Sequence, residues 1–345
     1  MPELPEVEVV RAGLENAVSG ATVTGVEVFD QRSLRRHDRS FGEFDALLTG
    51  ARIDAAVRRG KFLWFPLQPH PPVPDRTVLD RTVPDRTVPD RAVPERTVPD
   101  RAIVAHLGMS GQVLLRNAGE PPEKLLRIRL SLEHPVHGEL ALHFVDQRIF
   151  GSMAVDRLQA TGDGHPAGYA GPGLAPGSPP AGGAAATAAV WAGLIPSQVA
   201  HIGRDPLDPW FSAAEFYRAL GRSRSGIKRV LLDQNVVSGI GNIYADEALY
   251  EARVHFDQPA ASLSTVTARR LLNAVRAILS RALAEGGTSF DAQYVNVNGQ
   301  SGYFSHSLNA YGQHGRPCPR CGTELVRAKF MNRSSHFCPR CQRLR

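Results

Sequence analysis

The chain of 345 residues is long enough for two domains, and its hydrophobic content of 42% is ordinary for a soluble protein. No apolar run approaches the roughly 18 residues of a membrane span, and the acidic start lacks the apolar core of a secretory signal. We therefore expect a cytoplasmic protein without a membrane partner. The formal net charge of +6 fits an anionic partner.

Residues 3–19 are predicted to form a helix, because Pro5 suits a first turn and apolar residues recur at helical spacing from Val7 to Val18. Strands follow where short apolar and β-branched runs are bounded by turn residues. They are predicted at 22–29, 61–65, 103–107, 112–115, 125–132 and 139–145.

Two low-complexity stretches interrupt this pattern. A five-residue repeat fills 73–101, where proline excludes a regular helix or a central strand and Asp or Glu balances Arg. We interpret it as a solvated, extended insertion between two strands, without catalytic purpose. The Gly/Ala/Pro-rich stretch at 160–193 predicts a flexible linker. The predicted units are an N-terminal domain at 1–159, a linker at 160–200, a helical domain at 201–290 and a final segment at 291–345.

Helices are predicted in the second half at 211–220, 225–234, 242–252 and 268–285. Before the third helix, Gly239 and Gly241 permit a tight turn and a close approach of backbone N–H groups to a ligand. The helix N-terminus at Asn242 is then a candidate phosphate site, with Lys228 within reach. The alternative is an ordinary helical hairpin whose glycines only pack, and the spacing does not separate the two.

All four cysteines lie in the last 28 residues, as C-x2-C, sixteen residues, C-x2-C. This spacing is typical of a zinc ribbon, whereas two disulfides are disfavoured in a cytoplasmic protein and a redox motif needs only one pair. Four thiolates leave no open position for water, so one structural zinc ion is predicted. The ligands are Cys318, Cys321, Cys338 and Cys341. Residues 301–345 also hold eight Lys and Arg against one acid, which indicates either a nucleic-acid surface or a solubilising tail.

Pro2 is a candidate nucleophile. Removal of the initiator Met1 would leave a secondary amine, and an α-amino group titrates at about 8, so part of it is neutral at pH 7. Attack on the anomeric carbon of a sugar gives an iminium ion, which is cationic at every pH and promotes elimination of the phosphates. Glu3 and Glu6 stand beside it as candidate general acid–base groups. The alternative is a common start sequence whose proline only opens a helix.

Together these segments resemble the formamidopyrimidine-DNA glycosylase family of bacterial repair enzymes. The repeat and the linker fall outside the resemblance, which otherwise covers almost the whole chain in family order. The matching runs are PELPEVE from Pro2, RGK from Arg59, HLGMSG from His106, DQRIFG from Asp146, the helical pair at 228–245 and the four cysteines.

The resemblance implies a two-lobed α+β fold, with an N-terminal β-sandwich and flanking helices, then a helix–two-turn–helix domain and a zinc ribbon. Double-stranded DNA would lie across the basic cleft between the lobes of a monomer. The implied reaction joins excision of oxidised purines, such as 8-oxoguanine opposite cytosine and formamidopyrimidines, with strand cleavage at the abasic site by β- and δ-elimination.

Three alternatives stay open. An enzyme resembling endonuclease VIII would remove oxidised pyrimidines, although Leu4 favours the purine enzyme. A non-catalytic damaged-DNA-binding protein would not require the Pro2, Glu3 and Lys61 that are present. An RNA-associated zinc-ribbon protein leaves the N-terminal half unexplained.

Functional residues carry over only where the family motifs match. In this way Pro2 becomes the Schiff-base nucleophile, Glu3 the proton donor and acceptor, and Lys61 a group near the attacked sugar. Phosphate-binding residues match at Lys228, Asn242 and Arg333, and Arg333 is also linked to the second elimination. The side chains that fill and wedge the gap left by the extruded nucleotide match at Met109, Arg148 and Phe150.

Residues 289–302 correspond to the mobile loop that closes over the damaged base. Three departures concern DNA contacts. Arg127 is expected to replace a histidine contact. Ser223 occupies a position where the family is expected to carry a basic residue, so its neighbours Arg222 and Arg224 are expected to contact DNA instead. Ile149 occupies a position that is more often polar.

Overall fold

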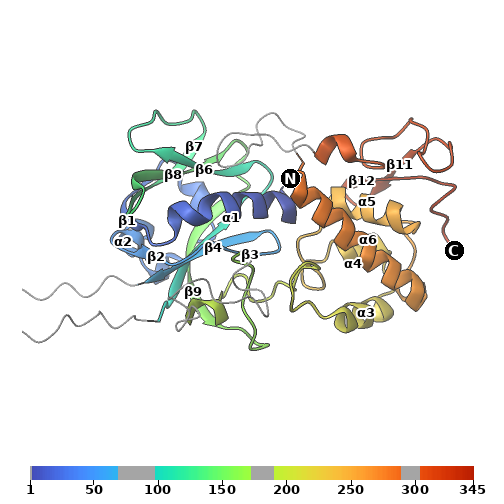
Figure 1. Cartoon of the computed structure of the whole chain (residues 1–345), viewed down its shortest axis with the longest axis horizontal. Coiled ribbons are helices and arrows are strands. Elements are labelled where there is room, and N and C mark those ends of the chain that lie inside the picture. Colours follow the sequence, from blue (N-terminus) through green and yellow to red (C-terminus); the bar gives the residue numbers. More distant parts are fainter. Residues whose placement is uncertain (1, 69–97, 172–189, 289–303) are drawn as a thin grey trace, which may run out of the picture.

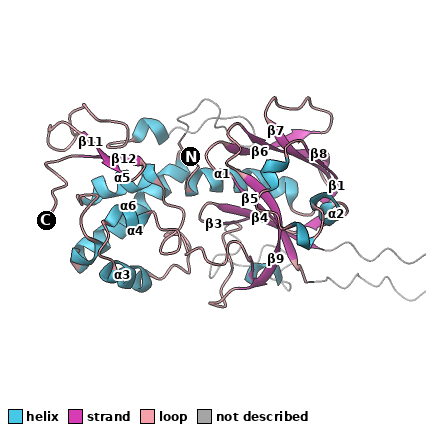
Figure 2. Ribbon diagram, turned by 180° about the vertical axis from the view of Figure 1, so that it is seen from behind, coloured by secondary structure: helices cyan, strands magenta, loops and turns pink. Residues whose placement is uncertain are grey.

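The computed structural model describes residues 2–68, 98–171, 190–288 and 304–345. A lobe rich in strands lies beside a mostly helical lobe that carries a small β-hairpin (Figures 1 and 2). The predicted two-lobed α+β fold is confirmed. Most of the repeat at 73–101, the centre of the predicted linker and the loop at 289–302 lie outside the described residues.

The N-terminal lobe is built on one antiparallel sheet. Within the described part of the chain, ten strands take part, in the order β10-β9-β5-β4-β2-β1-β7-β8-β6, with β3 beside β4. Their bounds are β1 Thr22–Val28, β2 Arg52–Ile53, β3 Val57–Arg59, β4 Phe62–Gln68, β5 Arg101–His106, β6 Gly111–Asn117, β7 Leu126–His134, β8 Gly138–Asp146, β9 Ser152–Ala160 and β10 Leu194–Pro196. The short helices η1 (Gln31–Leu34), η2 (Arg39–Phe41) and α2 (Phe44–Leu48) follow β1.

The sheet and one face of the helix α1 (Leu4–Val18) share one apolar core, while Ala12, Gly13 and Asn16 on the opposite face are exposed. Burial alternates along β7, so Ile128 and Leu130 point to the same face. Phe65 of β4 lies in that core, together with Val10 and Leu14 of α1. The two halves of the sheet thus face each other across a shared core, which is the predicted sandwich.

The predicted linker is partly built into this lobe. The N–H of Ala167 donates to the carbonyl of Ala192 at 2.6 Å, and β10 pairs with the end of β9. Ile195 and Val199 are buried in a cluster with Trp64. Residues 194–199 therefore pack on the N-terminal lobe, although the prediction placed them in the linker.

The repeat joins two neighbouring strand ends. Leu67 of β4 lies opposite Arg101 of β5, so Arg101, the last residue of the predicted repeat, already belongs to the sheet. Replacing residues 69–99 with an Asn-Gly hairpin turn is expected to preserve the fold and to raise the free energy of unfolding by up to about 2 kcal/mol, because the closed loop is shorter. Circular dichroism and thermal unfolding test this. A lower unfolding temperature than that of the full chain would show that the repeat stabilises the lobe.

The C-terminal lobe holds α3 (Ala213–Arg222), α4 (Ile227–Leu231), α5 (Asn242–Ala252) and α6 (Thr265–Ala284), followed by the hairpin β11 (Val326–Phe330) and β12 (Arg333–Phe337). Helix α4 ends earlier than predicted, because the Asp233 carboxylate accepts the N–H of Asn235 at 3.0 Å and forms a turn. Helix α6 starts earlier, because Ser264 caps it by accepting the N–H of Thr267. Among the described residues, no helix is long and apolar enough to cross a membrane.

Candidate active site

The start of α1 lies at the junction of the two lobes (Figure 1). The N–H of Leu4 donates to the carbonyl of Gly239 at 2.9 Å. Gly239 has a φ of +86°, and a Cβ there would lie 2.7 Å from the Cβ of Leu4. Glycine is therefore required for α1 to dock on the turn before α5, and this docking brings Pro2 between the lobes.

Glu3 caps helix α5 from the other lobe. Its buried carboxylate accepts N–H groups from Gly241 at 2.6 Å, Ile243 at 3.0 Å and Tyr244 at 3.4 Å. A Cβ on Gly241 would lie 2.3 Å from the Glu3 carboxyl carbon. Glu3 therefore occupies three of the N–H groups at the N-terminus of α5, and a phosphate contact at Asn242 stays a prediction.

Burial controls the protonation of Glu3. It raises the pKa of the Glu3 carboxyl above its ordinary value, against the opposing influence of the nearby Lys61 charge and of the N–H groups of α5. A carboxyl with a raised pKa keeps its proton at higher pH and can donate it. This is the property that a general acid needs.

Glu6 holds the chain at Pro2 and Glu3 in place. Its carboxylate accepts the N–H of Glu3 at 2.8 Å, the hydroxyl of Tyr244 at 2.5 Å and the N–H of Thr288 at 2.7 Å. Burial and the Glu6 charge raise the pKa of Tyr244, so the phenol remains a donor. Glu6 is thus a support for the site, with its oxygens engaged on three sides.

Lys61 reaches the same junction from the turn between β3 and β4. Its Nζ donates to the carbonyl of Ile240 at 2.8 Å. The preceding Gly60 has a φ of +56°, and a Cβ there would lie 2.6 Å from the Cβ of Ser238. Burial lowers the pKa of Lys61, with a further contribution from the charge of Arg333 and opposition from Glu3.

Two cavities are lined in part by these residues. The larger, of about 490 Å³, is lined by Pro2, Lys61, His106, Leu107, Gly108, Arg229, Leu232, Asp233, Gln234, Phe330, Met331, Asn332 and Arg333. The other, of about 460 Å³, is lined by Glu3, Met109, Asn242, Ile243, Tyr311, Arg327, Asn332, Arg333, Ser334 and His336. Both volumes suit a small ligand or an extruded base. Asn332 and Arg333, at the tip of the β11–β12 hairpin, line both cavities.

The three candidate wedge residues lie on adjoining surface loops. Met109 is 44% exposed and Phe150 49% exposed, so neither packs in a core. Arg148 is exposed between them in the chain, and its N–H donates to Asp146 at 3.1 Å. A Cβ on Gly108 would lie 2.3 Å from the backbone of Phe150, so the two loops touch.

Lys228, predicted to bind a phosphate, lies in the interior of the C-terminal lobe. Its side chain is fully buried, and Nζ lies 2.6 Å from the Asp246 carboxylate and 3.2 Å from the carbonyl of Ser334. Burial lowers its pKa despite the Asp246 charge. In this arrangement a direct phosphate contact is excluded, and Lys228 instead anchors the start of β12. Asn242 also donates to Ser334, at 3.1 Å.

Arg127 is likewise engaged inside the protein. Its Nε donates to the carbonyl of Asp146 at 2.8 Å, and a second nitrogen lies 3.5 Å from the Asp30 carboxylate. It therefore supports the loop that carries Arg148, which its assignment as a DNA contact did not foresee. Arg222 and Arg224 are exposed at the end of α3 but line neither cavity, so their contacts with DNA stay predictions.

Several residues that line the cavities were not among the predicted site residues, and Arg229 and Gln234 show why. Arg229 is exposed on α4 and faces the larger cavity, one position after Lys228. The helical period contained this signal, because Ile227, Val230 and Leu231 form the apolar face of α4 and Arg229 lies opposite them. Gln234 ties the turn together by donating to Ile240 and accepting the N–H of Gly239, both at 3.0 Å. Its side-chain contacts follow from the turn geometry, which no spacing predicts.

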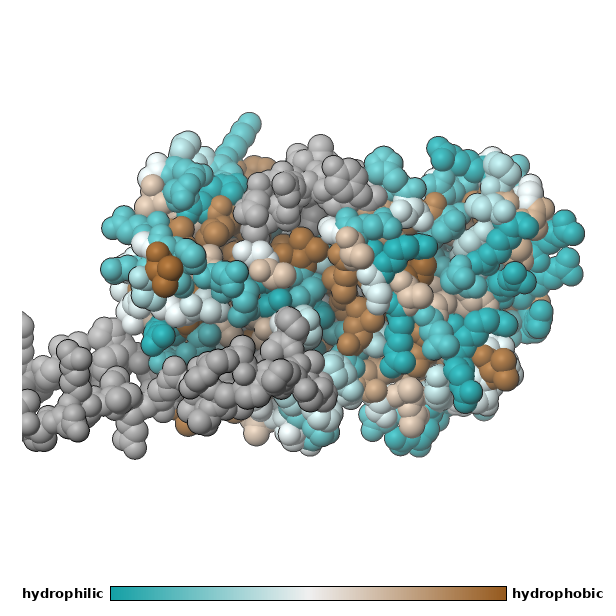
Figure 3. All heavy atoms as spheres, in the orientation of Figure 1, coloured by the Kyte–Doolittle hydropathy of each residue, from teal (hydrophilic) through white to brown (hydrophobic). Residues whose placement is uncertain are grey.

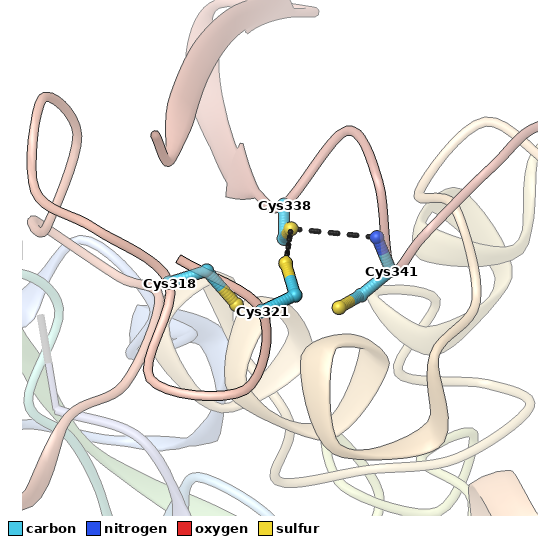
Figure 4. A group of neighbouring side chains, drawn as sticks. All are labelled: Cys318, Cys321, Cys338 and Cys341. Carbon is cyan, nitrogen blue, oxygen red and sulfur yellow. Dashed lines mark hydrogen bonds between the residues drawn. The ribbon is translucent and has the colours of Figure 1, made fainter. Parts of the chain in front are cut away.

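The four cysteines converge beside the β11–β12 hairpin (Figure 4). Their sulfur atoms all lie within 4.8 Å of one another. Four thiolates at this spacing fit a tetrahedral zinc ion and leave no position for a reacting water. Gln342 secures the second pair, because it accepts the N–H of Cys338 and donates to the carbonyl of Val254, both at 2.9 Å.

Replacing Cys338 with Ser is expected to release the metal and to unfold the hairpin while α5 and α6 persist. Zinc binding contributes about 10 kcal/mol or more to comparable small sites, far more than a two-stranded hairpin supplies alone. Metal analysis should find one zinc per chain in the wild type, and hydrogen exchange should show lost protection at Val326–Phe337 in the variant. Unchanged protection in metal-free protein would contradict a structural role.

The chain matches known proteins along most of its length. Family models described as the formamidopyrimidine-DNA glycosylase N-terminal domain, the formamidopyrimidine-DNA glycosylase H2TH domain and the zinc finger found in FPG and IleRS match residues 1–153, 202–293 and 315–344. The formamidopyrimidine-DNA glycosylase of Leifsonia xyli is 58% identical over 344 residues, covering all of both chains.

Solved structures agree with this match. MutM (Fpg) of Thermus thermophilus is 31% identical, with a TM-score of 0.69 and full coverage of both chains. Lactococcus lactis Fpg with abasic-site DNA is 26% identical, with a TM-score of 0.69 and 99% coverage of each chain. A mutant of that enzyme with Fapy-dG-containing DNA is 27% identical, with a TM-score of 0.70 and coverage of 99% of this chain and 100% of the other.

Proposed function

Since this chain belongs to the formamidopyrimidine-DNA glycosylase family, we propose that it is a bifunctional DNA glycosylase and AP lyase of base excision repair. Its substrates are double-stranded DNA with oxidised purines, such as 8-oxoguanine and formamidopyrimidines, and DNA with abasic sites. Abasic-site and Fapy-dG DNA in the Lactococcus lactis complexes support this assignment.

The observation that carries the proposal is the position of Pro2. It lines the larger cavity together with Lys61 and Arg333, contributed by different lobes, while the adjoining Glu3 lines the second cavity. A nucleophile, a proton donor and two cations thus meet between the lobes. A binding protein would not require the first two.

The geometry supports a sequence of bond changes. After removal of Met1, the neutral Pro2 nitrogen attacks C1′ of the deoxyribose, the glycosidic bond breaks, and the base leaves with a proton. The nitrogen loses its own proton, the C1′–O4′ bond breaks as O4′ takes up a proton, and the opened sugar is held as an iminium ion. The resulting iminium ion draws electrons from C2′, so loss of a C2′ proton expels the 3′ phosphate, and a second elimination expels the 5′ phosphate. Glu3 donates and accepts protons, and Lys61 and Arg333 stabilise the departing phosphates.

Exposed basic side chains at the larger cavity favour DNA as partner. Hydrophilic side chains dominate the visible outer end of the C-terminal lobe (Figure 3). Arg229 and Arg333 are exposed at the larger cavity and are available to a phosphate backbone. The enzyme would act as a monomer in the bacterial cytoplasm. Size-exclusion chromatography with light scattering tests the monomeric state.

Borohydride trapping on a duplex with 8-oxoguanine opposite cytosine tests the proposal. The expected result is a covalent adduct at Pro2, mapped by mass spectrometry of tag-free protein. An adduct only with an oxidised pyrimidine duplex would assign pyrimidine lesions instead. Binding without any adduct, from protein with a confirmed Pro2 amine, would refute the enzymatic function.

A further inference from the structure

The loop at 147–151, here called the wedge loop, is hydrogen-bonded by a residue from another part of the chain. Arg35 follows η1, and its guanidinium donates to two consecutive backbone carbonyls of the loop. One nitrogen lies 2.5 Å from the carbonyl oxygen of Ile149, and the other donates to the carbonyl of Phe150. The acceptors belong to the residues that directly follow Arg148.

Ile149, one of the two acceptors, has an unfavourable backbone conformation. Ile149 has a φ of +56°, in the left-handed region. A β-branched side chain collides with its own backbone there, which is why glycine or asparagine usually occupies such positions. The conformation must therefore be held by contacts from outside the residue.

Other contacts secure the ends of the wedge loop. The Asp146 carboxylate accepts the N–H of Arg148 at 3.1 Å and the N–H of Gly151 at 2.7 Å. The hydroxyl of Ser110 also donates to Asp146, at 2.6 Å. These bonds fix where the loop begins and ends, whereas Arg35 fixes the peptide orientation at its centre.

We infer that Arg35 is a positioning residue for opposite-base recognition: by holding the strained Ile149 it aims Arg148 at the base left unpaired by extrusion. A guanidinium reads a base edge only if its planar fork has the correct orientation, because both hydrogen bonds must form at once. A rotated peptide at Ile149 would turn Arg148 and Phe150 away from the gap. This inference rests on the proposed function.

The test compares excision of 8-oxoguanine opposite cytosine with excision opposite adenine. Arg35→Met should lower this ratio by roughly tenfold, the scale of one bidentate base contact, while cleavage of a preformed abasic site continues. Arg39→Met is the control, because Arg39 is exposed on the same segment and, among the described residues, its side chain donates one hydrogen bond, to Gln31 at 3.5 Å. Adding Ile149→Asn to Arg35→Met should restore most of the ratio, because asparagine tolerates the left-handed region.

Three results would overturn the inference. The first is an unchanged ratio in Arg35→Met, and the second is a wild-type ratio near one. The third is a ratio that Ile149→Asn does not restore, since Arg35 would then act on DNA directly rather than through the loop. Absence of a Pro2 adduct in the wild type would instead refute the proposed function, so the two failures are distinguishable.

Discussion

Replacing Pro2 with glycine is expected to slow strand cleavage at an abasic site at least about 100-fold, with little change in DNA affinity. Proline and glycine both supply an N-terminal amine, but only the secondary amine of proline forms an iminium ion that is charged without a further proton. The primary amine of glycine forms an imine, which must be protonated before it withdraws electrons equally well. The measurement is single-turnover cleavage of an abasic duplex, together with a binding titration.

Pro5→Ala provides the matched control for this substitution. Pro5 lies in the first turn of α1 and is buried, so its loss disturbs the start of the helix without touching the terminal amine. Mass spectrometry must show that Met1 is removed from every variant. If Pro2→Gly cleaved at the wild-type rate, or if Pro5→Ala lost as much activity, the role of the Pro2 amine would be refuted.

Much of the fold was predictable because its signals are local. The helix 242–252 agrees at both bounds, since Gly241 precedes it and Arg253 ends it in a left-handed conformation. The cysteine spacing predicted a cluster that the structure confirms, because a zinc ribbon needs only two tight turns. Strand β9 and the incorporation of β10 into the sheet were missed. Strand β10 has only three residues beside a Gly-rich stretch, so it has no periodicity of its own.

The site was predictable by residue type but not by contact. The proposed roles of Pro2, Glu3 and Lys61 came from chemistry and resemblance, and stay proposals. That Glu3 caps α5 depends on two segments about 240 residues apart, which sequence spacing does not connect. The burial of Lys228 likewise depends on Asp246 one helix later. A charged side chain in a helix is expected to be exposed unless its partner is known.

Replacing Glu3 with glutamine is expected to slow base excision by about 10² to 10⁴-fold, the usual contribution of a general acid or base. The substitution keeps the size of the side chain but removes the exchangeable carboxyl proton. Cleavage of a preformed abasic site should fall less, because the glycosidic bond is already broken. Single-turnover rates on an 8-oxoguanine duplex and on an abasic duplex separate the two steps.

The role of Glu3 also predicts the direction in which the excision rate changes with pH. Excision needs the protonated Glu3, so the Glu3 contribution declines as pH rises through the folded pKa. Burial raises that pKa, and the declining limb should therefore lie above the ordinary carboxyl range. This limb should be absent from Glu3→Gln, and a limb that persists unchanged would assign it to another group.

A second variant separates the charge of Glu3 from its position. Gly241→Ala keeps the carboxyl but places a Cβ where 2.3 Å separates it from the Glu3 carboxyl carbon, so Glu3 must move. Glu3→Gln loses one of the acceptors of the α5 N–H groups, at a cost of about 1–3 kcal/mol, which thermal unfolding will register. If Gly241→Ala folds and excises normally, the capped position of Glu3 is not required for proton transfer. If both variants bind DNA but do not excise the damaged base, catalysis depends on a carboxyl group held at the N-terminus of α5.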